Sequence, residues 1–155
     1  MQVKYTFKIC YNRESLCGKD AMIMQLSKFT DYTFRALIYL AKHTDKLCTV
    51  EELATYLDVS EHHMKKVIHQ LAKTDYVLSI KGRSGGLKLG VAPCEINLGK
   101  VFRMTEETGN IVECFSNIET CKYIQGGCKL KGIIQRSLNK FIEEFDQYTL
   151  EDILD

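Results

Sequence analysis

The chain has 155 residues, a formal net charge of +1 and seven cysteines, and it is long enough for a single domain with a buried core. It contains no apolar run long enough to span a bilayer and no stretch typical of a secretory signal, which excludes a membrane protein and predicts a reducing, cytoplasmic location. In that compartment clustered cysteines indicate metal or redox chemistry more often than disulfides.

Charge is unevenly distributed along the chain. Between residues 61 and 90 the acidic residues are Glu61 and Asp75, whereas the basic ones are Lys65, Lys66, Lys73, Lys81, Arg83 and Lys88. After Lys140 every charged residue is acidic. A basic middle and an acidic end indicate one face that binds a polyanion and another that is kept away from it.

Residues 28–43 are predicted to form a helix that is buried on two sides. Its main apolar side is formed by Phe29, Tyr32, Ala36, Leu37, Leu40 and Ala41, which recur at helical spacing. Phe34 and Ile38 form a second apolar face. Asp31 lies near the N-terminus of this helix, where the helix dipole stabilises a carboxylate.

Two short helices joined by a tight turn come next. Thr49 and Glu52 form a capping box that opens the first, whose buried residues are Leu53, Ala54 and Leu57. The turn occupies residues 58–60, and Ser60 is expected to cap a second helix over residues 60–73. The buried stripe of that helix is Met64, Val67, Ile68 and Leu71. This is a helix-turn-helix pattern.

Two strands are predicted after the second helix, at residues 76–80 and 87–91. The loop between them reads Lys81-Gly82-Arg83-Ser84-Gly85-Gly86, and its glycines permit the positive backbone dihedrals of a tight hairpin. The hairpin completes a winged helix, and Pro93 closes this region.

The free face of the second short helix and the tip of the hairpin carry the side chains predicted to bind DNA. The helix is expected to enter the major groove, and Arg83 the minor groove with help from Ser84. The predicted DNA-binding residues are Ser60, His62, His63, Lys65, Lys66, His69, Lys81, Arg83 and Ser84. The alternative is a zinc-stapled or metal-free winged helix that acts as a protein-interaction adaptor. The density of basic residues favours DNA.

The C-terminal part is predicted to contain a short helix, a cysteine-containing loop and a long amphipathic helix. Asn97 is expected to cap the short helix, which ends near Gly109. Apolar residues at threes and fours define the long helix: Leu130, Ile133, Ile134, Leu138, Phe141, Ile142 and Phe145. This stripe is about 25 Å long, more than a small domain covers alone, and indicates a homodimer formed through residues 130–145.

Cys114, Cys121 and Cys128 are evenly spaced, with six residues between each pair. Structural zinc sites usually pair cysteines two to four residues apart, so that one turn of chain surrounds the metal. Wider gaps suit an iron–sulfur cluster, whose iron atoms lie apart and prefer thiolates. The alternative is three unrelated cysteines, since free cysteine is often simply buried. The even spacing and the Gly126-Gly127 pair favour a cluster.

Three regions follow from these patterns. Residues 1–23 show no clear period and are expected to be a disordered arm or an over-extended start. Residues 24–93 form the winged helix-turn-helix region, and residues 94–155 the cluster-binding loop and dimerisation helix. The expected fold is mainly α with a small β-hairpin wing. No phosphate-binding loop, activated nucleophile or paired-carboxylate site is visible, so we do not expect an enzyme.

From Met24 onward the chain resembles the Rrf superfamily of winged-helix transcriptional regulators, and within it the NsrR repressors, which sense nitric oxide. The resemblance covers almost all of the chain after residue 23. Its motifs are Met24-Gln25-Leu26, Phe29-Thr30-Asp31-Tyr32, Arg35-Ala36-Leu37-Ile38-Tyr39, Val59-Ser60, His63-Met64, Gly85-Gly86-Leu87-Lys88-Leu89-Gly90, Cys128-Lys129-Leu130-Lys131 with the two preceding cysteines, and Tyr148-Thr149-Leu150.

The resemblance implies a homodimeric repressor with one 4Fe–4S cluster per subunit, a 2Fe–2S cluster being the alternative. Cys114, Cys121 and Cys128 would hold the cluster, and its attack by nitric oxide would release a palindromic operator. In NsrR-type proteins a carboxylate from the first helix of the other subunit completes the ligand set, and Asp31 is the matching residue.

A regulator of iron–sulfur or redox status from the same superfamily is the alternative function. Regulators of cluster assembly, the IscR type, use a histidine three residues after the third cysteine. This chain has Lys131 there, whose ammonium group has no lone pair to offer at neutral pH. That residue counts against the cluster-assembly alternative.

Overall fold

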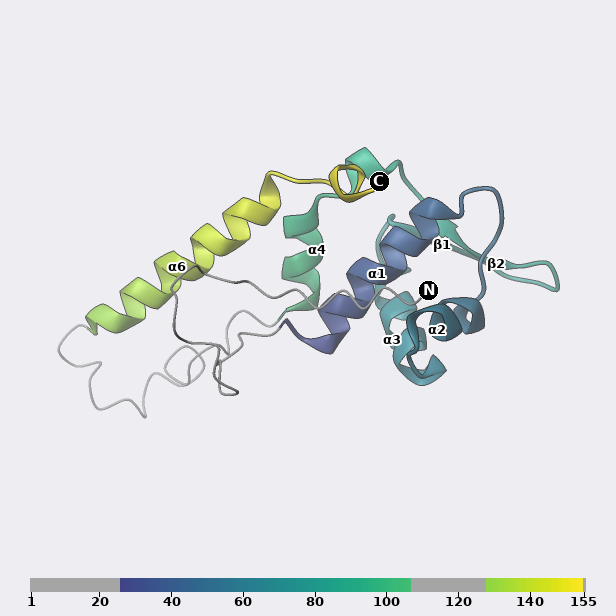
Figure 1. Cartoon of the computed structure of the whole chain (residues 1–155), viewed down its shortest axis with the longest axis horizontal. Helices are drawn as coiled ribbons and strands as arrows, with labels where there is room; N and C mark the ends of the chain where they lie inside the picture. The colour runs from purple at the N-terminus through teal and green to yellow at the C-terminus, as the bar shows by residue number, and fades with distance from the viewer. Residues whose placement is uncertain (1–25, 107–127, 155) are drawn as a thin grey trace, which may run out of the picture.

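The computed structural model describes residues 26–106 and 128–154; the expected arm, Gly109, Cys114 and Cys121 lie outside the described residues. The described helices are α1 (Lys28–Lys42), α2 (Val50–Leu57), α3 (Glu61–Leu71), α4 (Leu98–Thr105) and α6 (Lys129–Asp146), with short 3-10 helices η1 (Pro93–Glu95) and η5 (Glu151–Ile153). The strands are β1 (Val77–Ile80) and β2 (Gly86–Leu89) (Figure 1). The predicted fold class, mainly α with a β-hairpin, is confirmed.

The predicted elements are present with small shifts at their ends. The second short helix ends at Leu71 rather than at residue 73, and β2 ends at Leu89 rather than at residue 91, although the amide of Gly90 still donates to the Tyr76 carbonyl. Helix α4 stops at Thr105, before the predicted end near Gly109, because Glu106 adopts an extended backbone. The hydroxyl of Thr105 also bonds back to the carbonyl of Val101, 3.0 Å away.

Helix α1 lies at the centre of the fold. It contacts α2, α3, α4 and β2, and the side chains of Ala36 and Leu37 are fully buried. Phe34 and Ile38 are half-buried against the same core, so the helix is covered on two sides as predicted. The sequence did not predict that Thr30 and Thr33 are also buried on this helix.

The caps of the helix-turn-helix form as predicted. Thr49 Oγ1 accepts from the amide of Glu52 at 3.1 Å, and the Glu52 carboxylate accepts from the amide of Thr49 at 2.7 Å. Asp58 closes α2 in a left-handed conformation with φ of 54°, which Asp tolerates better than most residues. Ser60 then caps α3.

The wing is tied to the segment that precedes α2. Strands β1 and β2 are antiparallel, with Val77 opposite Leu89. Cys48 pairs with Leu87 on the outer edge of β2 through two backbone hydrogen bonds of 2.9 and 2.7 Å. Gly86 is required at this approach, because a Cβ there would lie 2.8 Å from the Cβ of Leu47. The wing is therefore held on the helix-turn-helix by backbone pairing.

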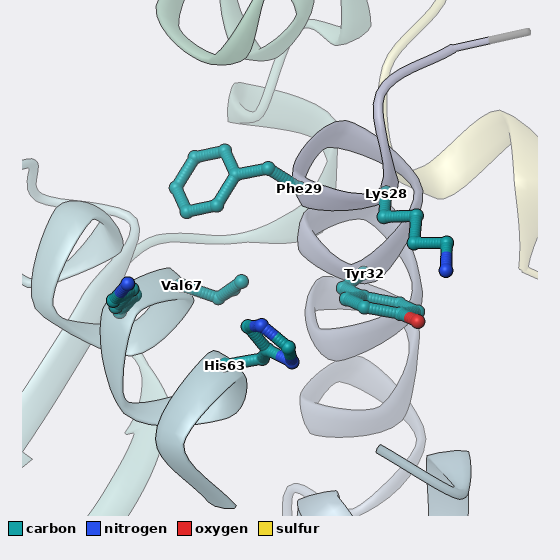
Figure 2. A pocket seen from close by; sticks show the side chains of 6 residues that line it. Lys28, Phe29, Tyr32, His63 and Val67 are labelled. Atoms are coloured by element: carbon teal, nitrogen blue, oxygen red, sulfur yellow. The ribbon is translucent and has the colours of Figure 1, made fainter. Parts of the chain in front are cut away.

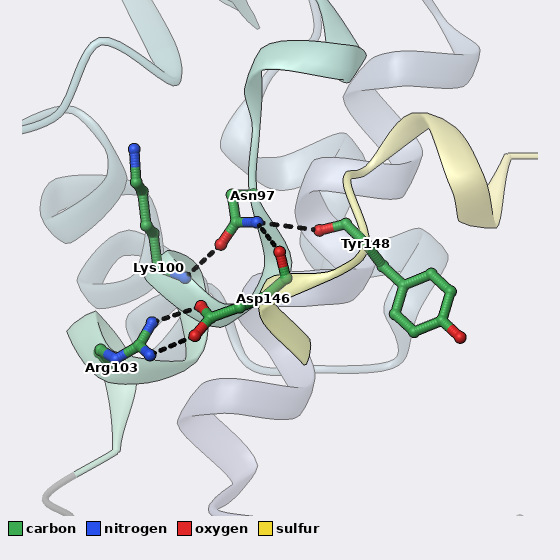
Figure 3. Close-up of polar contacts among 5 residues, drawn as sticks. All are labelled: Asn97, Lys100, Arg103, Asp146 and Tyr148. Atoms are coloured by element: carbon green, nitrogen blue, oxygen red, sulfur yellow. Dashed lines mark hydrogen bonds and ion pairs between the residues drawn. The ribbon is translucent and has the colours of Figure 1, made fainter. Parts of the chain in front are cut away.

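Helix α6 is anchored to α4 at its C-terminal end (Figure 3). Arg103 donates two hydrogen bonds to the two oxygens of Asp146, and Asn97 donates to the Asp146 carbonyl at 2.7 Å. Gly99 makes this approach possible, since a Cβ would collide with the Asp146 side chain and lie 2.9 Å from its backbone nitrogen. Rings of Phe102, Phe141 and Phe145 pack alongside.

The other end of α6 is largely uncovered. Of its predicted apolar stripe, Ile142 is buried, whereas Leu130 and Ile133 are 62% and 51% exposed. Figure 1 shows this end of the helix extending away from the remaining elements. No described helix is both long enough and apolar enough to cross a membrane.

The Arg103–Asp146 pair predicts a pH-dependent contribution to stability. The guanidinium holds the pKa of Asp146 below its ordinary value of 3.8, so the stabilisation is complete above that pH and is lost as the pH falls through the lowered pKa. Asp146→Asn should therefore lower the melting temperature at about pH 7, and the difference from the wild type should shrink toward about pH 2.5. Glu143→Gln removes an exposed charge from the same helix and is the control. A difference that is independent of pH would contradict this role of the pair.

Candidate nucleic-acid interface and thiolate residues

Helix α3 presents a polar face to solvent. His62, His63, Lys65, Lys66 and His69 are exposed, while the opposite stripe of Met64, Val67, Ile68 and Leu71 is buried. The hydroxyl of Ser60 caps the helix and lies 3.0 Å from His63 Nδ1, which fixes that ring near the first turn. Lys65 pairs with Glu61 at 2.8 Å, so part of its charge is neutralised within the helix. The polar face is the one expected to meet DNA.

The remaining predicted DNA-binding residues lie on the loop between β1 and β2. Lys81, Arg83 and Ser84 are all exposed, and Gly82 has φ of 120°, a conformation that favours glycine. The loop projects away from the helices (Figure 1). The loop could therefore contact a different part of a DNA duplex from the groove that α3 would enter.

Two further polar residues lie beside α3, and the sequence alone did not identify them. Lys28 and Tyr32 of α1 line a small hollow together with His63, Lys66 and the apolar Phe29 and Val67 (Figure 2). Tyr32 was predicted only as part of the apolar side of its helix. The sequence feature that could have identified them is Lys28, a basic residue one turn before Tyr32. Both lie on α1, which packs directly on α3.

The cysteines within the described residues differ in environment. Cys128 is half-buried at the position immediately before α6, where the helix dipole favours an anionic ligand such as a thiolate. Cys48 is buried, and burial raises the pKa of its thiol, so it remains protonated. Cys94 is exposed in η1. Of these, Cys128 has the setting expected of a metal ligand.

Asp31 lies in the first turn of α1 and pairs with Arg35 at 2.9 Å. Both side chains are more than 40% exposed, so another ligand can compete for the carboxylate. Figure 1 shows the first turn of α1 well separated from the Cys128 end of α6. Within residues 26–106 and 128–154, no group of three or more His, Cys, Asp or Glu side chains is gathered as a metal site.

A polar junction joins the start of α1 to the end of α4. The hydroxyl of Thr30, which is fully buried, donates to Thr105 Oγ1 at 2.9 Å, and Ser27 Oγ lies 3.0 Å from Thr30. The amide of Ser27 donates to the Glu106 carboxylate at 2.7 Å. Glu106 is the last described residue before the segment that contains Cys114 and Cys121. The junction therefore links the C-terminal end of α4 to the turn that carries Asp31.

Comparison with known protein families gives the class of the protein. The model of the Rrf2 family, described as "Iron-dependent Transcriptional regulator", matches residues 26–155. The chain belongs to the Rrf2 family. It is a DNA-binding transcriptional regulator and not an enzyme, which confirms the class predicted from the sequence.

Individual relatives agree with the family assignment. A protein of Bacillus licheniformis named HTH-type transcriptional regulator NsrR is 41% identical over 132 residues, covering 84% of this chain and 92% of the relative. The protein of the same name from Bacillus subtilis is 39% identical over 132 residues, with coverage of 84% and 90%.

Solved structures match the fold as well. The structure of CymR, the global cysteine regulator of B. subtilis, is 27% identical, with a TM-score of 0.61 and coverage of 84% of this chain and 96% of that one. The IscR structure from T. potens has a TM-score of 0.67 at 22% identity, over 85% and 87% of the two chains, and supports the fold alone.

The buried junction at Thr30 predicts a specific loss of stability. Thr30→Val keeps the shape but removes the hydroxyl that bonds to Thr105, and should cost about 1 kcal/mol. For a chain of this size the melting temperature should fall by about 2–4 °C. Thr44→Val, at an exposed position, is the matched control and should leave the melting temperature unchanged. Equal melting temperatures for Thr30→Val and the wild type would show that the hydroxyl pair contributes nothing.

Proposed function

We propose that this protein is a homodimeric repressor that binds an iron–sulfur cluster of the 4Fe–4S type and releases a palindromic operator when nitric oxide is present. The observation that carries the proposal is the combination of an exposed polar face on α3 with a cysteine at the start of α6. The first is a DNA-reading surface, and the second is the last of three evenly spaced thiols.

The DNA contacts are assigned to the exposed side chains of α3 and of the wing loop. Ser60, His62, His63, Lys65, Lys66 and His69 would face the major groove, and Lys81, Arg83 and Ser84 an adjacent backbone or minor groove. These side chains are exposed, and the α3 stripe behind them is buried. The relatives named HTH-type transcriptional regulator support this use of the helix.

The chemistry of the donor set fits an iron–sulfur cluster. Cys114, Cys121 and Cys128 would supply three thiolates, and the carboxylate of Asp31 from the partner subunit the fourth ligand. Cys128 lies at a helix start, and Asp31 is exposed and held only by a surface ion pair. When bound, the cluster would supply iron sites that react with nitric oxide. The family description "Iron-dependent Transcriptional regulator" agrees with an iron cofactor.

The dimer would form along the predicted stripe at residues 130–145. Leu130 and Ile133 are exposed and the half of α6 that carries them lacks cover from the other described elements. A second copy of the helix would bury these side chains and bring Cys128 of one subunit toward α1 of the other. Two copies of α3 would then read two half-sites of a palindrome.

Release of DNA would follow from the loss of this cross-subunit link. With Asp31 bound in trans, the N-terminal turn of each α1 is fixed relative to the partner. Without it, the subunits would populate arrangements in which the two α3 helices are wrongly spaced. The polar junction at Thr30 and Thr105 is placed to pass such a change from the segment after Glu106 to α1.

The decisive experiment measures colour and DNA binding together. Protein purified without oxygen should absorb visible light, contain iron and sulfide, and bind duplex DNA in a salt-dependent manner. Nitric oxide should bleach it and weaken binding at least about tenfold, which is about 1.4 kcal/mol. Cys128→Ala and Cys121→Ala should abolish the colour, whereas Cys48→Ala and Cys94→Ala should retain it. A colourless protein with stoichiometric zinc would refute the proposal.

The role of Asp31 is tested by a pair of substitutions in the same salt bridge. Asp31→Ala removes the proposed ligand, and we expect faster loss of the cluster in air and a weaker response to nitric oxide. Arg35→Ala removes the partner of Asp31 but leaves the carboxylate, so the cluster should be retained. The cross-subunit ligand is wrong if Asp31→Ala changes neither the visible spectrum nor the response.

A further inference from the structure

The hollow between α1 and α3 is a defined feature of the surface beside the recognition helix. Its volume is about 80 Å³, and its lining, which includes Phe29 and Val67, is mostly apolar. Lys28 and Tyr32 of α1 and His63 and Lys66 of α3 also line it (Figure 2). Two helices that belong to different parts of the sequence therefore contribute cations to one place.

Within the part of the chain that the structure describes, no acidic side chain neutralises the lysines at the hollow. Among the described residues, Lys28 and Lys66 make no ion pair, and no carboxylate lines the hollow. The nearby acidic residues on the same helices are already paired, Asp31 with Arg35 and Glu61 with Lys65. An anion that reaches this place would have two lysines beside it that form no ion pair with a described residue.

The size of the hollow restricts what it can hold. Sites for whole metabolites or cofactors occupy about 300–1,000 Å³, so this hollow is too small for them. It fits a single group with an apolar side and an anionic side. A sugar–phosphate unit of a nucleic-acid strand has both, a carbon face for Phe29 and Val67 and phosphate oxygens for the lysines.

The position of the hollow agrees with such an occupant. The major groove of B-DNA is about 12 Å wide, and a helix with its side chains is about 10–12 Å across, so α3 would fill the groove. An element that packs beside the N-terminal half of α3 can then lie close to the phosphate backbone that borders the groove. The first turn of α1 packs there, beside His63, Lys66 and Val67.

We propose that this hollow binds one phosphate of the DNA backbone, and that Lys28 and Tyr32 of α1 extend the DNA interface beyond α3 and the wing. The inference rests on the proposed function and adds a contact from a helix outside the helix-turn-helix. Backbone contacts position a protein without reading sequence, so Lys28 should strengthen binding to all duplexes equally.

The test compares Lys28→Ala with the wild type as full-length, cluster-loaded proteins. Fluorescence anisotropy is measured with two duplexes, one enriched by the wild type from a random library and one of unrelated sequence, at 50–200 mM salt. Loss of one phosphate contact should reduce the slope of log K against log salt by about 0.9, which is about 3.5-fold less change in affinity over this range. The loss should be equal on both duplexes, and Lys28→Arg should restore the slope.

Lys42→Ala is the matched control, because Lys42 is an exposed cation in the last turn of the same helix, far from the hollow. Its slope should equal that of the wild type. An unchanged slope for Lys28→Ala, or a loss confined to the enriched duplex, overturns the inference while leaving the proposed function intact. Absence of salt-dependent binding by the wild type itself would overturn both.

Discussion

Burial of α1 is the constraint on which the other parts of the structure depend. The helix contacts α2 and α3 of the helix-turn-helix, β2 of the wing, and α4. Leu37 is fully buried and Leu40 almost so, and truncating either to alanine would cost about 2–5 kcal/mol. Because interiors are close-packed, a displacement of α1 cannot be absorbed locally and must move its neighbours. The recognition helix and the wing are thus positioned by one common support.

The first turn of α1 carries both the candidate cluster ligand and a candidate DNA contact. Asp31 points toward solvent, Thr30 is buried against Thr105, and Lys28 lies at the edge of α3. Three polar residues within four positions of the chain are therefore fixed to one rigid element. A change at the end of α4 would reach the turn that carries Lys28 and Asp31 through the hydrogen bond between Thr105 and the buried Thr30.

Local signals in the sequence predicted much of this arrangement. Thr49, Ser60 and Asn97 were identified as caps because a cap and its partner amide are only a few residues apart. Membership of a family of winged-helix regulators followed from motifs with fixed spacing. The DNA-binding and metal-ligand residues remain predictions, since Cys114 and Cys121 lie outside the described residues and a second subunit would contribute to the site.

Contacts between distant parts of the chain were not predictable in the same way. Thr30 and Thr105 are 75 residues apart, and Arg103 and Asp146 are 43 apart. Each of these residues is unremarkable in its own segment, and only the packing of helices makes it a partner. The pairing of Cys48 with the wing was missed for the same reason. Lys28 was not predicted either, because its candidate role depends on α3, which packs beside it.

The anchoring of α6 at one end has a mechanical consequence. Its 18 residues make a rod of about 27 Å, which is fixed near Asp146 against Gly99 and begins next to Cys128 at its other end. A tilt of about 5° at the fixed end would displace the far end by about 2 Å, comparable to the length of a bond from iron to sulfur. Gly99 therefore acts as a pivot for the longest described helix, and the contact at one end of α6 determines the position of Cys128 at the other.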